Sequence, residues 1–131
     1  MQLRVVTPTE EKVDIEVTEV TLPGILGELG ILPDHTPLMT ALVAGVVRYK
    51  GPTGDGLLAI NRGFAEILDN EVTLLVETAE RPEEINVERA EAALKRAQDM
   101  QADPPEDFDR ERSQRSERRA RARIEVSKAR S

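Results

Sequence analysis

Residues 3–76 contain one short apolar run after another, and each run is bounded by residues that favour turns. Between residues 13 and 18, valine and isoleucine alternate with acidic residues and threonine, the period-two pattern of a half-buried strand. Further runs rich in strand-forming residues span 3–6, 20–22, 43–50, 57–60, 64–68 and 72–76. Many short strands at this spacing, with no helical period between them, predict an antiparallel β-sandwich or barrel.

Two of the connections have recognisable turn chemistry. Asp69-Asn70 stands between two apolar runs, and these two residue types tolerate positive φ best after glycine, so a two-residue hairpin turn is predicted there. The glycine-rich stretch 51–56 predicts a looser hairpin tip.

The pattern changes at Pro82, which disfavours helical angles at Arg81 before it. We therefore expect a β-sandwich domain at residues 1–82 and a helical domain at residues 83–131. Asn86 is the predicted N-cap of a first helix that ends near Met100, before a double proline. Its narrow apolar stripe consists of Val87, Ala90, Leu94 and Ala97.

A second helix is predicted from about Phe108 to Lys128. Its weak apolar face consists of Ser113, Ser116, Ala120 and Ile124, and a second line consists of Arg112, Arg115, Arg119 and Arg123. Small residues bury little apolar surface, so we expect a loosely held hairpin. The predicted fold class is α+β: an N-terminal antiparallel β-sandwich followed by a C-terminal two-helix antiparallel hairpin.

Charge is distributed unevenly along the chain. Residues 109–131 carry nine basic and four acidic residues, whereas residues 1–108 carry nine basic and 21 acidic residues. This asymmetry predicts docking between the two parts, an acidic partner for the tail, or both. The chain has no cysteine and a single histidine, His35, so a thiolate metal site and a cysteine nucleophile are excluded. Its apolar runs are far shorter than the roughly 20 residues of a membrane span, and its N-terminus lacks a signal-peptide h-region.

The signature segment, residues 27–38, reads Gly-Glu-Leu-Gly-Ile-Leu-Pro-Asp-His-Thr-Pro-Leu. Its glycines and prolines predict a shaped loop with exposed aliphatic side chains. This segment resembles the signature of the epsilon subunit of the F-type (rotary) ATP synthase. Further similarities are the Ile-Asn-Arg-Gly-Phe-Ala-Glu run at 60–66, with Arg62 where the family commonly has glycine, the strand and exit at 72–81, the Ile-Asn-Val-Glu-Arg-Ala run at 85–90 and the basic run at 118–123.

The resemblance covers almost the whole chain and implies a role. Epsilon subunits are non-catalytic rotor subunits of the central stalk, and they couple the gamma subunit to the c-ring in proton-driven ATP synthesis. Their C-terminal hairpin can leave the sandwich, extend toward the catalytic beta subunits and restrain ATP hydrolysis. The resemblance also implies a peripheral position at the cytoplasmic face of the bacterial inner membrane, or on the stromal or cytoplasmic side of a thylakoid membrane.

The same resemblance assigns expected partner contacts to the signature segment. Glu28, Leu29 and Ile31 are expected to face the c-ring, and His35 is expected to lie toward gamma. The alternative is that the aliphatic residues fold inward, which we expect for Leu32 and Leu38. A lone histidine without convergent partners forms neither a metal site nor a catalytic dyad.

The arginine line (Arg112, Arg115, Arg119 and Arg123) has three interpretations. We place contact with an acidic surface of the beta subunits first, a solvated helix face second, and nucleic acid last, because the first 108 residues are acidic and lack aromatic stacking platforms.

No cofactor or metal is expected, but some bacterial members of the family bind ATP as a regulatory ligand. The matching positions are Glu80, Arg89, Ala90, Arg119 and Arg123. The family's aspartate at the helix start is Asn86 here, so a plain N-cap beside surface arginines is the alternative. A different functional class also stays open: a free-standing β-sandwich binding module with a basic helical tail for an acidic protein or RNA.

Overall fold

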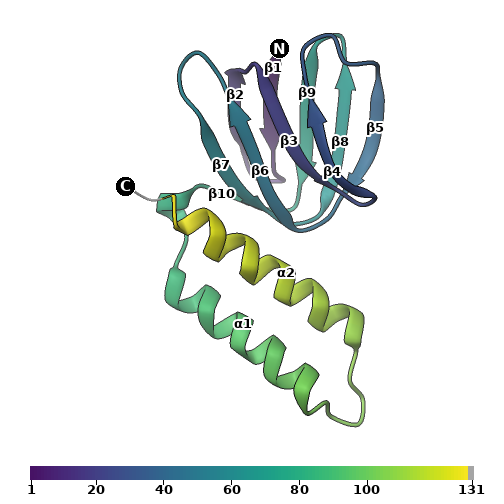
Figure 1. Ribbon diagram of the computed structural model, residues 1–131, viewed down its shortest axis with the longest axis vertical. Coiled ribbons are helices and arrows are strands. Elements are labelled where there is room, and N and C mark those ends of the chain that lie inside the picture. Colours follow the sequence, from purple (N-terminus) through teal and green to yellow (C-terminus); the bar gives the residue numbers. More distant parts are fainter. Residues whose placement is uncertain (130–131) are drawn as a thin grey trace.

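The computed structural model describes residues 1–129 as a β-domain with two antiparallel helices below it (Figure 1). Arg130 and Ser131, at the end of the predicted helical domain, lie outside the described residues. The strands are β1 (Gln2–Val6), β2 (Glu11–Glu16), β3 (Glu19–Gly24), β4 (Gly27–Ile31), β5 (Leu38–Leu42), β6 (Gly45–Lys50), β7 (Gly56–Ile60), β8 (Gly63–Leu68), β9 (Glu71–Val76) and β10 (Ala79–Glu80). The 3-10 turn η1 (Pro82–Glu84) leads into α1 (Val87–Ala102) and α2 (Arg110–Ser127).

The strands form a folded sheet in the order β10-β7-β6-β3-β5-β8-β9-β1-β2, with β4 paired to β3. All pairs are antiparallel except β1 with β9. The sheet turns a corner between β3 and β5, which share the single register pair Gly24–Leu42. The two halves face each other as the layers of a sandwich, so the α+β prediction of a β-sandwich followed by a helical hairpin is confirmed.

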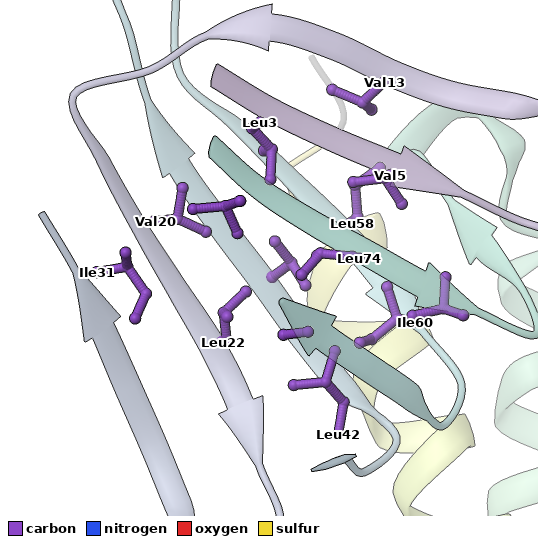
Figure 2. Close-up of a cluster of buried hydrophobic side chains, with 14 of the residues drawn as sticks. Leu3, Val5, Val13, Val20, Leu22, Ile31, Leu42, Leu58, Ile60 and Leu74 are labelled. Atoms are coloured by element: carbon purple, nitrogen blue, oxygen red, sulfur yellow. The ribbon is translucent and has the colours of Figure 1, made fainter. Parts of the chain in front are cut away.

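Branched aliphatic side chains from both layers fill the space between them (Figure 2). Alternation along the strands decides which residues point inward, because successive side chains of a strand face opposite sides of the sheet. On β9, for example, Leu74 is fully buried while Leu75 is 55% exposed. The core is therefore built almost without aromatic residues, as the composition requires.

The predicted β8–β9 turn is confirmed. Asp69 and Asn70 have φ values of 51° and 61°, and Leu68 pairs with Glu71 directly across the turn. Asn70 also ties this turn to the connection after β4, because its Oδ1 accepts a hydrogen bond from the Asp34 backbone N–H at 2.8 Å.

The signature segment is less of a loop than expected. Its residues 27–31 form β4, which pairs with β3 through the register Val20–Ile31 and Leu22–Leu29, and Leu38 already begins β5. The backbone groups at 27–31 are satisfied by a neighbouring strand, so the glycines there permit a tight hairpin rather than prevent a strand. Only residues 32–37 form an irregular connection.

The predicted N-cap of α1 is confirmed, and α2 begins with a cap of the same kind. The Asn86 side chain accepts a hydrogen bond from the backbone N–H of Arg89 at 3.0 Å, and the Asp109 side chain accepts one from the backbone N–H of Arg112 at 3.1 Å. These bonds satisfy backbone donors that the first helical turn leaves free. Within residues 1–129 no helix is long and apolar enough to span a lipid bilayer.

Candidate functional site

The helical hairpin α1–α2, called the arm below, rests on the sandwich through α2, while α1 packs mainly on the far side of α2 (Figure 1). Ala90 and Ala97 of α1 are buried against Ser113 and Ala120 of α2. The Ser113 hydroxyl donates to the Ala97 carbonyl at 3.3 Å. The helix–helix contact therefore consists of the small residues that the sequence predicted, and it allows the helices to approach closely.

The second buried face of α2, which docks on the sandwich, was missed by the sequence interpretation. Ala122 and Val126 are buried with Ala59 of β7 and with Ile85, the residue that joins η1 to α1. Val126 stands six residues after Ala120, on a different face of α2 from the predicted stripe. The signal was present in the apolar pair at 122 and 126, spaced by four residues, but the charged residues Arg123 and Glu125 between them obscured it.

Two ion pairs border this docking contact. Arg123 Nε lies 2.6 Å from Glu80 Oε1 on β10, and Arg48 of β6 pairs with Glu125 of α2. The second pair is about half exposed on both sides, so solvent screens it and its contribution is small.

The junction between the domains is held separately from the arm. Lys12 Nζ of β2 lies 2.5 Å from Glu84 Oε2, and the Arg81 guanidinium donates to the Lys12 carbonyl at 2.6 Å. Burial acts to raise the pKa of Glu84, but hydrogen bonds from Lys12 and from the Arg81 backbone N–H outweigh it and lower the pKa. These contacts attach η1 to β2.

An apolar groove of about 760 Å³ runs over the outer face of β5, β8 and β9. Strand register places Ala41, Phe64 and Leu75 side by side, with Val6 of β1 next to Leu75. Phe64 and Leu75 are 59% and 55% exposed. Exposed apolar surface of this kind marks contacts with other molecules. The sequence predicted the strands but not this groove, because single-strand alternation does not reveal an outer face that is itself apolar.

The walls of the apolar groove are charged and come from both domains. Arg62, in the turn before β8, pairs with Glu77 at 2.7 Å, while Arg115 and Arg118 reach the groove from α2. Within residues 1–129, neither of these two α2 guanidinium groups makes a hydrogen bond or an ion pair. The docked arm therefore forms part of the surface that a groove ligand would meet.

The residues expected at the c-ring and gamma contacts are only partly on the surface. Glu28 is exposed and Leu29 is half-buried on β4. Ile31 is fully buried in the core, so its side chain is not available to a partner; its place opposite Val20 turns it inward. The prediction that Leu32 folds inward is wrong. Its side chain is 58% exposed, because β4 ends before it.

Glu28 and His35 are separated by the length of β4. Glu28 lies near the β3–β4 turn and lines a cavity together with Arg118 and Arg121 of α2. His35 follows the other end of the strand, half-buried, and its Nδ1 lies 2.6 Å from the Thr36 carbonyl.

The arginine line is not uniformly presented by the docked arm. Arg112 and Arg115 are exposed, whereas Arg119 and Arg123 are partly covered. Burial lowers the pKa of Arg119, and the neighbouring cations of Arg123 and Arg115 lower it further. This end of α2 therefore holds like charges close together, and Glu80 neutralises one of them.

The residues expected to bind nucleotide do not converge on one cavity. Glu80, Arg119 and Arg123 meet at a cavity of only about 10 Å³, far less than a nucleotide needs. Arg119 and Arg123 also line a groove of about 520 Å³ between α1 and α2, together with Arg96 and Arg112. Arg89 is exposed, Ala90 is buried, and neither lines this inter-helix groove.

No metal centre is formed by the described residues, in which no group of three histidine, aspartate or glutamate side chains is arranged to hold an ion.

Comparisons with known proteins match both parts of the chain. Residues 1–82 match the family described as the ATP synthase, Delta/Epsilon chain, beta-sandwich domain, and residues 83–128 match its long alpha-helix domain. The ATP synthase epsilon chain of Desulfosudis oleivorans is 47% identical over 100 residues, covering 75% of this chain and 74% of the relative. The epsilon chain of Nitratidesulfovibrio vulgaris is 40% identical over 126 residues, covering 96% and 94%.

A solved structure supports the same fold. A chain in the Euglena gracilis mitochondrial ATP synthase structure (OSCP/F1/c-ring) is similar with a TM-score of 0.80 and 24% identity, over 95% of this chain and 79% of that one.

Proposed function

The chain belongs to the ATP synthase delta/epsilon family, and from this premise we propose how its surfaces serve the rotary complex. It is an epsilon-type subunit of the central stalk of an F-type ATP synthase and takes part in ATP synthesis there. The observation that carries this conclusion is the match of both domains, in order, over residues 1–128. Its own role is coupling and regulation rather than catalysis, and its position is peripheral, at the cytoplasmic face of the membrane.

The apolar groove binds the gamma subunit. Its floor is the exposed row centred on Phe64 and Leu75, and a stable protein contact needs such an apolar centre with a polar rim. The double variant Phe64→Ser with Leu75→Ser, called the floor variant below, tests this assignment. We expect it to stay folded by circular dichroism and to lose affinity for purified gamma at least tenfold by calorimetry; unchanged affinity would remove the groove from the interface.

The exposed carboxylate of Glu28 contacts the c-ring. It stands with half-buried Leu29 on the β3–β4 hairpin, whose turn also exposes Ile25 and Leu26. This end of the sandwich therefore presents a carboxylate beside apolar side chains. With Glu28→Lys, the catalytic part of the enzyme should dissociate from membrane vesicles at a lower salt concentration than it does with the unmodified chain. Asp14→Lys, with the same charge change on the exposed face of β2, is the matched control and should release it normally.

The arm restrains ATP hydrolysis when it leaves the sandwich. The residues that dock the arm are few, and two arginines of the line, Arg119 and Arg123, are partly covered in the docked state. An acidic surface of the beta subunits therefore competes with the sandwich for these two groups. Arg119→Ala with Arg123→Ala should raise hydrolysis by the assembled enzyme, because the inhibitory contact is lost.

The partner of Arg123 gives a sharper control. Glu80→Gln removes the docked ion pair but leaves the arginines intact, so it should favour the extended arm and lower hydrolysis. If both variants change hydrolysis in the same direction, the arginines do not act through two alternative contacts.

ATP is a second ligand to test. The inter-helix groove of about 520 Å³ with four arginines along it favours binding of a polyphosphate there rather than at Glu80. Titration of the full chain with ATP should saturate at one nucleotide per chain and weaken strongly in Arg96→Gln with Arg112→Gln. Equal binding by this variant would exclude the inter-helix groove.

A further inference from the structure

The docked arm supplies one wall of the apolar groove, and this wall carries the groove's unpaired charges. Arg115 and Arg118 project from α2 beside the floor formed by Phe64 and Leu75. Arg62 on the sandwich side is already neutralised by Glu77 at 2.7 Å. In the described part of the chain, Arg115 and Arg118 have no such partner. A groove ligand with apolar anchors alone would leave both cations at its edge without a counter-ion.

The chemistry of this surface specifies its occupant. An apolar floor accepts aliphatic or aromatic side chains, and two guanidinium groups on one side accept carboxylates through paired N–H donors. The fitting segment therefore has apolar residues that enter the groove and acidic residues that face α2. Charge complementarity of this kind selects partners and orients them.

We propose that Arg115 and Arg118 bind carboxylates of the gamma segment that occupies the groove, so that gamma holds the arm docked. This rests on the proposed assignment of the groove to gamma. The coupling is reciprocal: if gamma binds more tightly to the chain with a docked arm, bound gamma stabilises docking by the same factor. Arg115 also belongs to the arginine line, so the same guanidinium group cannot serve gamma in the groove and beta in the extended arm. Gamma bound in the groove therefore shifts the equilibrium toward the docked arm and away from the extended arm.

Calorimetric titration of the full chain with purified gamma tests the proposal. Arg115→Gln with Arg118→Gln should weaken binding about fivefold or more, and the loss should shrink at high salt, because screening weakens exposed charge pairs. Arg110→Gln with Arg121→Gln removes the same charge from α2 at positions that do not line the groove. This control should change the affinity less than about twofold.

Hydrogen exchange of α2 supplies a second readout that affinity alone does not give. Bound gamma should slow exchange of the α2 amides in the unmodified chain and in the control, but not in Arg115→Gln with Arg118→Gln.

The floor variant separates the two levels of the proposal. If it loses gamma binding while the Arg115 and Arg118 variant keeps full affinity and full α2 protection, the arginine contact is overturned and the groove assignment stands. If the floor variant itself binds gamma normally, the groove assignment fails.

Discussion

The sandwich and the arm are held together by buried residues of different sizes. Between the two sheet layers, leucine, isoleucine and valine side chains are buried completely, and each large aliphatic side chain contributes about 1.5–3 kcal/mol when it leaves water. The arm is held by alanines, two serines and one valine of α2, which bury far less apolar surface. The two regions therefore differ in how much apolar surface holds them: much between the sheet layers and little between the arm and the sandwich.

The largest expected effect is on the stability of the sandwich. Leu74→Ala removes a fully buried side chain from β9, so we expect a loss of about 2–5 kcal/mol in the free energy of unfolding. Urea denaturation of the full chain measures it.

The neighbouring residue provides the control. Leu75 lies on the outer face of the same strand, and Leu75→Ala should change the free energy of unfolding by less than about 1 kcal/mol. Equal losses for the two variants would mean that the inward and outward faces of β9 are not energetically distinct.

The sequence predicted much of this fold because local signals and the final structure agree. Alternation located most of the strands, Asp69 and Asn70 have the positive φ values that their turn requires, and Asn86 caps α1. The prediction failed at β4, where Gly27 and Gly30 suggested a loop. Pairing with β3 overrides that local preference, and a single sequence does not show which strands will pair.

The candidate site was less predictable because it depends on tertiary contacts. Alternation does not show that Phe64 and Leu75 are neighbours, since strand register joins them. Val126 was not assigned to any apolar face, because its partners Ile85 and Ala59 are distant in the sequence and meet it only in the folded chain. The charge asymmetry predicted docking between the two parts of the chain, an acidic partner for the tail, or both, and the Arg123–Glu80 pair is a contact of the first kind.

The second prediction concerns a substitution that weakens docking of the arm and leaves the sandwich core unchanged. Val126→Ala removes two methyl groups from the docking contact, at a cost of about 1–2 kcal/mol. Hydrogen exchange should accelerate in α2 and stay slow in β8 and β9. Val46→Ala, a half-buried change on the sandwich side of the same contact, should produce a smaller acceleration. Equal acceleration in β8 and β9 would mean that the arm and the sandwich unfold as one unit.

A third and smaller effect concerns the charges around the docked arm. Glu80→Gln removes the partner of Arg123, so Arg119 and Arg123 then repel each other without compensation. Since the pair is partly exposed, we expect docking to weaken by about 1 kcal/mol or less. The exchange rate of α2 amides measures this, and high salt should reduce the effect. An effect as large as that of Val126→Ala would show that charge, rather than apolar burial, dominates docking.

The smallest expected effect tests the junction that keeps the two regions attached. Hydrogen bonds from Lys12 and the Arg81 backbone N–H lower the pKa of Glu84 in the folded chain. A lowered folded-state pKa contributes stability that is complete above the unfolded-state pKa of about 4.3 and is lost as the pH falls through the folded-state pKa.

Glu84→Gln should therefore reduce the free energy of unfolding by about 0.5 kcal/mol or less at pH 7. The difference should shrink as the pH falls toward and through the folded-state pKa, because the protonated glutamate no longer pairs with Lys12. Urea denaturation at pH 7 and pH 3.5 compares the two chains, with Glu83→Gln on the exposed side of the same turn as the control. A difference that persists unchanged at the lower pH would mean that the Glu84 carboxylate does not hold η1 to β2 through its charge.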